Sequence, residues 1–170
     1  MTDDSLPTRR TLLYAGVVTI LVPRIARANV LDILWEDLIP AGVPYAQIIG
    51  KGDMDVVADT WAPIFDENAT KLNLELDGAL VRLPGYLLPL ELTAAGVTSF
   101  VLVPYVGACI HVPPPPPNQL VFVEAQKPWP NGSLWEPILV TGRLTAQMQS
   151  TAVAEIGHSL SATDIERFRW

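Results

Sequence analysis

The chain has 170 residues, of which 49% are hydrophobic and 17% charged, and its 18 acidic residues against 11 basic ones give a formal net charge of −7. This charge excludes a basic nucleic-acid binder, because affinity for a phosphate backbone grows with the lysines and arginines that neutralise it. A single cysteine excludes an internal disulfide and any zinc site built on two or more thiolates of one chain.

The first 28 residues predict a twin-arginine signal peptide. Arg9 and Arg10 precede an apolar stretch, residues 11–22, which is shorter than the roughly 17 to 25 residues that span a bilayer. Ala26-Arg27-Ala28 has the small-x-small pattern of a cleavage site, and no cysteine nearby could carry a lipid. We therefore expect a periplasmic protein without a stable membrane anchor after cleavage. Without its signal, the chain keeps 16 acidic and 7 basic residues.

Residues 29–170 are expected to form a single exported domain that begins with an N-terminal arm, residues 29–58. The arm interleaves aliphatic residues with acids and ends in a turn-rich stretch, so we expect it to pack on the domain. A short helix is expected next, entered through a cap at Asp59 or Thr60. The apolar residues whose spacing predicts this helix are Trp61, Ile64, Phe65 and Leu72.

From residue 79 the pattern indicates β-structure. Strands are expected at residues 79–83, 86–92, 98–103, 120–124 and 138–148, with a last segment, residues 153–168, that closes the sheet. A bulge or bend is expected at Pro84-Gly85, since proline cannot donate to a strand ladder. Short antiparallel strands plus one short helix predict a mainly β protein, a small barrel of the oligonucleotide/oligosaccharide-binding (OB) type, with a β-sandwich as the alternative.

The most unusual segment joins a Cys-x-His pair to five consecutive prolines, Pro113 to Pro117. Such a run predicts a rigid polyproline II strut. Cys109 and His111 lie at one end of the strut, and Asn118 and Gln119 lie at the other. In an extended backbone the cysteine and the histidine share one face, because side chains two apart point the same way.

Three interpretations of this pair compete. As a metal site, a thiolate and an imidazole suit zinc or copper. The best candidate for a third ligand is Glu91, and the next best is His158. As a catalytic pair, His111 would activate Cys109 as a nucleophile, with Asn118 or Gln119 polarising a carbonyl. The third interpretation is structural: a buried, inert cysteine and a histidine bonded to a backbone carbonyl.

The segment from Pro104 to Gln119 resembles a bacterial family of exported proteins known as domain of unknown function 3299. The run that carries the resemblance contains Pro104, Tyr105, Gly107, Ala108, Cys109, Ile110, His111, Pro113 to Pro116, Asn118 and Gln119. Similar residues extend from Trp35-Glu36-Asp37 through Leu76-Asp77-Gly78 and Pro89-Leu90-Glu91 to Thr141-Gly142-Arg143, which covers most of residues 30–168.

The resemblance implies an exported or lipid-anchored protein, encoded in some bacteria near components of ATP-driven (ABC-type) transporters and linked to zinc supply. Glu91, Cys109 and His111 match the family pattern, whereas His158 stands where the family more often has tyrosine. Tyr105, Gly107, Pro113, Pro117, Asn118 and Gln119 complete the motif. We expect a binding or accessory protein that handles zinc or copper; the alternatives are a thiol-dependent enzyme and a purely structural interaction module.

Overall fold

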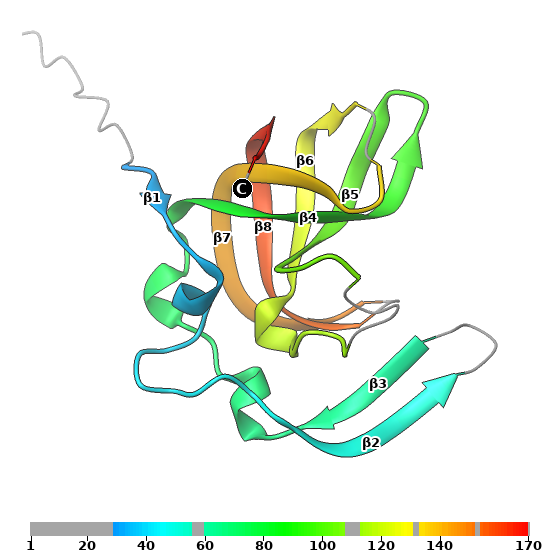
Figure 1. Ribbon diagram of the computed structural model, residues 1–170. Helices are drawn as coiled ribbons and strands as arrows, with labels where there is room; N and C mark the ends of the chain where they lie inside the picture. The colour runs from blue at the N-terminus through cyan, green and yellow to red at the C-terminus, as the bar shows by residue number, and fades with distance from the viewer. Residues whose placement is uncertain (1–28, 56–59, 108–112, 131–132, 152–153, 170) are drawn as a thin grey trace, which may run out of the picture.

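A computed structural model describes residues 29–55, 60–107, 113–130, 133–151 and 154–169 (Figure 1). Within them the chain forms eight strands and four short 3-10 helices. The elements in chain order are β1 (Leu31–Asp32), η1 (Trp35–Leu38), β2 (Ile48–Asp55), β3 (Thr60–Phe65), η2 (Glu67–Thr70), η3 (Leu74–Leu76), β4 (Leu80–Thr93), β5 (Gly96–Val103), η4 (Pro117–Gln119), β6 (Val121–Trp129), β7 (Glu136–Ser150) and β8 (Glu155–Arg167).

Five strands close into a barrel in the order β4-β5-β6-β8-β7, because β7 also pairs with β4. All pairings around this barrel are antiparallel except that between β6 and β8, which run parallel. β4 closes the barrel by pairing with β7 through its first half and with β5 through its second half. The prediction of a small OB-type barrel is confirmed, and the β-sandwich alternative is wrong because the sheet closes on itself.

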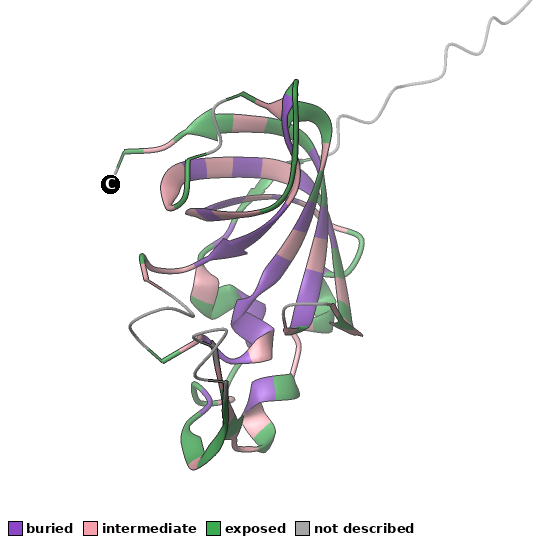
Figure 2. Cartoon of the chain, turned by 90° about the vertical axis from the view of Figure 1, so that its right-hand side faces the viewer, coloured by how far each residue is buried: buried purple, intermediate pink, exposed green. Residues whose placement is uncertain are grey.

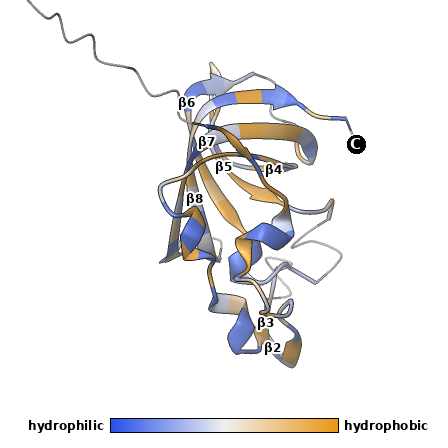
Figure 3. Cartoon of the chain, turned by 90° about the vertical axis from the view of Figure 1, so that its left-hand side faces the viewer, coloured by the Kyte–Doolittle hydropathy of each residue, from blue (hydrophilic) through white to orange (hydrophobic). Residues whose placement is uncertain are grey.

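Apolar residues at every second position of the strands fill the barrel. In β7, for example, Ile138, Val140 and Leu144 are fully buried, whereas Arg143 and Thr145 between and after them are exposed. Figure 2 shows buried residues concentrated in the barrel strands, and Figure 3 shows the hydrophobic stretches on the same strands. This period of two is the pattern that a sheet with one buried face requires.

The N-terminal arm covers one side of the barrel. β1 pairs in parallel with the start of β4, and the following η1 inserts Leu38, which is fully buried, into the barrel core. Trp35 packs against the same core, and its indole Nε1 donates a hydrogen bond to the Pro84 carbonyl at 2.8 Å. The first part of the arm is therefore packed on the barrel core, whereas its later part, residues 48–55, forms β2 in a separate two-stranded sheet.

The helix that the sequence predicts from Thr60 is wrong in its position. Residues 60–65 form β3, which pairs with β2 in a separate two-stranded sheet, and helical structure begins only at Glu67 in η2. The reason is that exposed and partly buried side chains alternate along residues 61–65, as in a strand, although the spacing of the apolar residues also suits a helix. Ala62 and Ile64 are exposed, whereas Trp61, Pro63 and Phe65 are partly buried.

The bulge that the sequence predicts at Pro84-Gly85 is also wrong. Both residues stay in register with β7, opposite Leu139 and Ile138, and the irregularity of β4 falls further on, between Pro89 and Leu92. In an extended strand the N and the carbonyl of one residue point to the same side. The Pro84 carbonyl accepts from Trp35 of the arm, so the missing N–H of Pro84 is also on the arm's side and takes no bond from the ladder with β7. In the part of the chain that the structure describes, no helix has the length and apolarity that crossing a membrane requires.

Candidate functional site

The two ends of the segment that carries the Cys-x-His pair are joined by one hydrogen bond. Tyr105 follows β5, and its hydroxyl donates to the carbonyl of Pro113 at 2.8 Å. Gly107 has a φ of +83°, a left-handed conformation that favours glycine and turns the chain beyond Tyr105. Cys109 and His111 themselves lie outside the described residues. Their segment therefore starts and ends at neighbouring points on the barrel.

The proline run is seated on the protein. Pro115 and Pro116 are buried, Pro113 is exposed, and Pro116 has φ −64° and ψ 156°, which is polyproline II geometry. The run ends in η4, which begins at Pro117. Trp61, Pro63 and Phe65 of β3 line a small groove of about 220 Å³ against Pro114, Pro115 and Pro117. The separate β2–β3 hairpin and the strut therefore face each other (Figure 1).

Asn118 and Gln119 anchor the end of the strut. Asn118, fully buried, donates through Nδ2 to the carbonyls of Asn68 and Lys71 at 2.8 and 3.0 Å. Gln119, 2% exposed, donates through Nε2 to the carbonyls of Trp35 and Asn118 at 2.9 and 3.1 Å. Both N–H groups of each amide are thus engaged by backbone carbonyls. Neither amide has a free N–H with which to polarise a substrate carbonyl, as the thiol interpretation would require.

Glu91 belongs to β4 and pairs with the middle of β5, whereas Tyr105 follows the end of β5. Glu91 is exposed and stands opposite Ser99, whose hydroxyl donates to its carboxylate at 3.5 Å. Val103, from which the chain leaves β5 towards Tyr105, stands opposite Tyr86. Val103 is four residues further along the strand than Ser99, a distance of about 13 Å. Among the described residues, no group of three histidine, cysteine, aspartate or glutamate side chains could hold a metal ion.

His158 is a fully buried, unpartnered polar side chain of β8. Neither ring nitrogen has a hydrogen-bond partner among the described residues. Its strand neighbours are Val121 of β6 and Ala146 of β7, which carry no charge. Burial lowers the pKa of His158 to about 4, because the apolar surroundings disfavour the charged imidazolium.

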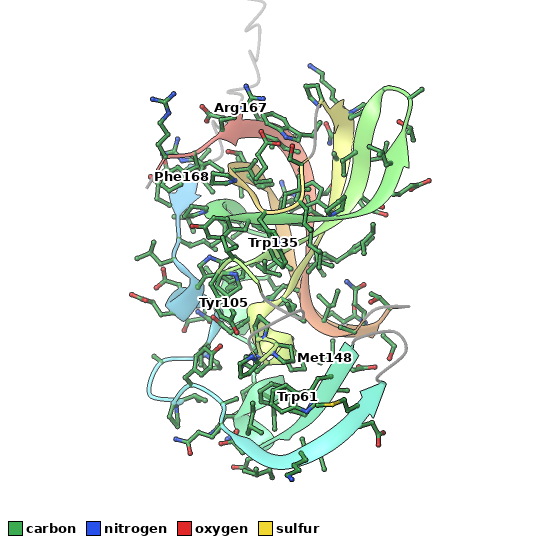
Figure 4. All side chains as sticks on the ribbon, turned by 45° about the vertical axis from the view of Figure 1, so that its right-hand side comes forward. Trp61, Tyr105, Trp135, Met148, Arg167 and Phe168 are labelled. Atoms are coloured by element: carbon green, nitrogen blue, oxygen red, sulfur yellow. The ribbon has the colours of Figure 1, made fainter. Side chains whose placement is uncertain are left out.

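A groove of about 570 Å³ lies beside Tyr105, between the arm and the end of β5. Residues 40–43 and Pro104 contribute to its walls, and six further side chains line it: Trp35, Glu36, Ile39, Tyr45, Tyr105 and Gln119. Figure 4 shows Tyr105 next to the arm segment that carries η1. A volume of this size falls within the range of small-molecule sites. We call it the aromatic groove.

The sequence identifies one wall of the aromatic groove and misses the other. Tyr105 and Gln119 belong to the predicted motif, whereas Trp35, Glu36 and Tyr45 lie in what the sequence presents as a packing arm. The signal available was two aromatic side chains around the turn Pro40-Ala41-Gly42-Val43-Pro44. Two aromatic residues near a turn do not predict which distant segment of the chain will lie against that turn.

Comparison with known proteins gives a family and a matching fold. The family model described as "Protein of unknown function (DUF3299)" matches residues 35–167. A crystal structure of a DUF3299 family protein from Pseudomonas aeruginosa PAO1 is 34% identical in sequence; the match covers 82% of this chain and 96% of that chain, with a TM-score of 0.66. No curated protein matches the chain. Neither description names an activity.

Proposed function

The chain belongs to the DUF3299 family of proteins of unknown function, and on that premise we propose that it is an exported, non-catalytic accessory protein that binds zinc or copper. In this proposal the protein acts in the periplasm alongside an ABC-type transport system. Cys109 and His111 supply a thiolate and an imidazole, the ligand types that suit these two metals. Glu91 is the third ligand that the sequence predicts.

The observation that carries the proposal is the hydrogen bond from Tyr105 to Pro113. It fixes both ends of the segment that contains the two ligands, and the buried Pro115 and Pro116 continue that support towards η4. A metal site gains affinity when its ligands are held close to their bound arrangement before the metal arrives. Ligation also accounts for a single thiol in an oxidising compartment, where an exposed free cysteine would be oxidised.

The thiol-enzyme alternative has less support. A nucleophilic cysteine needs a base and a group that stabilises the developing charge on the substrate carbonyl. The amides of Asn118 and Gln119, which the sequence suggests for the second role, donate all their N–H groups to backbone carbonyls. The metal interpretation requires nothing of these two amides except that they hold the strut in place.

Metal content tests the proposal directly. The full chain, with its own leader, is expressed in a bacterium with twin-arginine transport, and the protein is purified from the periplasm and analysed by elemental mass spectrometry. We expect close to one zinc or copper per chain, lost in both Cys109→Ser and His111→Ala. Glu124→Gln, an exposed acid on neighbouring β6, is the matched control for Glu91→Gln. Metal-free protein, even after incubation with either metal, would overturn the proposal.

Alkylation of Cys109 separates the alternatives on the same samples. A metal-bound thiolate should be protected from iodoacetamide until a chelator is added. A catalytic thiol should react unusually fast at low pH without a chelator, because its pKa would be depressed. A structural thiol should react only when the protein unfolds. Glu91→Gln is compared with Glu124→Gln separately from the Cys109 and His111 variants, because Glu91 pairs with the middle of β5, away from the strand end that leads to Tyr105.

A further inference from the structure

The aromatic groove combines three aromatic side chains with one carboxylate. Trp35, Tyr45 and Tyr105 come from both of its walls, and Glu36 stands beside Trp35 in η1. Of the described residues that line it, none is lysine, arginine or histidine. The carboxylate of Glu36 has no ion-pair or hydrogen-bond partner in the described part of the chain. As far as the described residues go, the groove therefore carries one negative charge without a compensating group on a largely apolar surface.

Groups on the groove's inner side are fixed. The indole of Trp35 donates to the Pro84 carbonyl at 2.8 Å, and the carbonyl of Trp35 accepts from the buried Gln119 at 2.9 Å. Tyr105 is held by its bond to Pro113. Asp37, the other acid of η1, accepts from the backbone N–H of Leu34 at 2.8 Å, so it is occupied in capping. Rigid rings and a free carboxylate form a prepared surface that loses little freedom when a ligand binds.

We propose that the aromatic groove binds a small organic cation with an apolar body, of the quaternary ammonium class. The aromatic rings would attract a diffuse positive charge through their electron-rich faces, and the carboxylate of Glu36 would compensate that charge. A neutral apolar ligand would leave Glu36 uncompensated, and an anion would be repelled by it. The proposal goes beyond the metal function and does not depend on Cys109 or His111.

The ionisation state of Tyr45, which is 49% exposed, is consistent with this chemistry. A tyrosine hydroxyl, with an ordinary pKa of about 10, is neutral at physiological pH, and partial burial raises the pKa of Tyr45 further. A neutral phenol adds no second negative charge to the groove. It keeps an aromatic ring available to the ligand across the range in which a periplasmic protein works.

The test compares choline with 3,3-dimethylbutan-1-ol, which has the same shape but carries carbon in place of the charged nitrogen. Each is titrated into isotopically labelled protein, and the backbone amide resonances are followed by NMR. We expect choline to shift resonances from residues 35–45 and 104–105, and the neutral isostere to bind at least fivefold more weakly. Equal binding of both probes would show an apolar groove only and would overturn the proposal, as would the absence of shifts at these residues.

Four variants assign the effect to particular groups. Glu36→Gln removes the charge and keeps the shape, and Tyr45→Leu removes a ring and keeps an apolar side chain. We expect each to weaken choline binding about fivefold. Tyr45→Phe, which keeps the ring, and Glu75→Gln, an exposed acid outside the groove, should bind choline as the parent does. An equal loss in Glu75→Gln would mean that choline responds only to the overall negative charge, and would also overturn the proposal.

Discussion

The indole of Trp35 packs directly against Gly85, in the space that a side chain at position 85 would occupy. A Cβ placed on Gly85 would stand 2.9 Å from Cζ2 of Trp35 and 2.7 Å from Cγ of Leu102. Real Cβ atoms almost never approach other heavy atoms so closely. The indole therefore uses the space that glycine leaves in β4, and its Nε1 reaches the carbonyl of the preceding Pro84. Pro84-Gly85 thus acts as a docking point for the arm within a continuous strand.

Gly85→Ala should destabilise the protein by about 1 to 3 kcal/mol, because an extra methyl forces the packed neighbours to shift. Denaturant unfolding followed by tryptophan fluorescence measures this loss. Gly50→Ala is the control, since the added carbon would meet only the Ile64 side chain, 3.2 Å from its Cδ1 and 3.4 Å from its Cβ. If both variants lost the same stability, the close packing of Trp35 on Gly85 would not be the cause.

Asn118→Ala should cost about 1 to 3 kcal/mol, because it leaves the carbonyls of Asn68 and Lys71 without their buried donor. Amide hydrogen exchange should rise around η2 and η4 more than in the barrel strands. Asn73→Ala is the comparison, since Asn73 also donates to a backbone carbonyl, that of Asp37, but in an exposed hydrogen bond; its Oδ1 in addition accepts from the Glu75 N–H as the cap of η3. Its loss should be clearly smaller. A uniform rise in exchange across the barrel would contradict a local anchoring role.

The barrel strands were predictable because alternation along each strand is a local property of the sequence. β5 and β7 contain the predicted stretches 98–103 and 138–148, and β6 and β8 overlap the predicted stretches 120–124 and 153–168. The errors arise where tertiary contacts override local pattern. Residues 60–65 have an apolar spacing that suits a helix, but Trp61 and Phe65 face the proline strut, which lies about fifty residues further along the chain. The local pattern of one sequence cannot predict that residues 60–65 will pack against the proline strut.

The candidate site was predictable only where it is continuous in sequence. The run from Tyr105 to Gln119 is unusual in itself, and the polyproline II geometry of Pro116 confirms one part of that prediction. The aromatic groove needs residues 35–45 and residues 104–119 to meet, and only the barrel brings them together. The sequence predicts Glu91 close to the motif because it lies on a strand that pairs with the strand leading to the motif. The register of β4 and β5, which places Glu91 opposite Ser99, is not visible in the sequence.

His158 should make folding stability depend on pH between about 4 and 6.5. Its folded-state pKa, about 4, lies below the ordinary value of 6.5. Between these values the unfolded chain binds more protons than the folded one, so stability rises with pH and is lost on acidification from 6.5 to 4. The effect is on the order of 3 kcal/mol. Urea midpoints measured from pH 4 to pH 8 would show it.

Because carboxylates also titrate in this range, the informative quantity is the difference between the parent and His158→Phe. The phenyl ring keeps an apolar body of similar size and removes the titrating nitrogens. At pH 7 the variant should be at least as stable as the parent, since no buried nitrogen is left unpaired. Below pH 6.5 its advantage should grow as the pH falls. Parallel pH curves for the two proteins would contradict a buried neutral histidine.

Tyr105→Phe should weaken metal binding without unfolding the protein. The change removes only the hydroxyl that donates to Pro113, so the ring stays in the aromatic groove while the ends of the Cys109–His111 segment are released. One neutral hydrogen bond contributes about 0.5 to 1.5 kcal/mol, so zinc affinity, measured by competition with a chromophoric chelator, should fall about two- to tenfold. Tyr45→Phe removes a hydroxyl from the same groove but leaves the segment ends joined, and it should keep full affinity. Equal loss in both variants would mean that the bond between Tyr105 and Pro113 does not support the metal site.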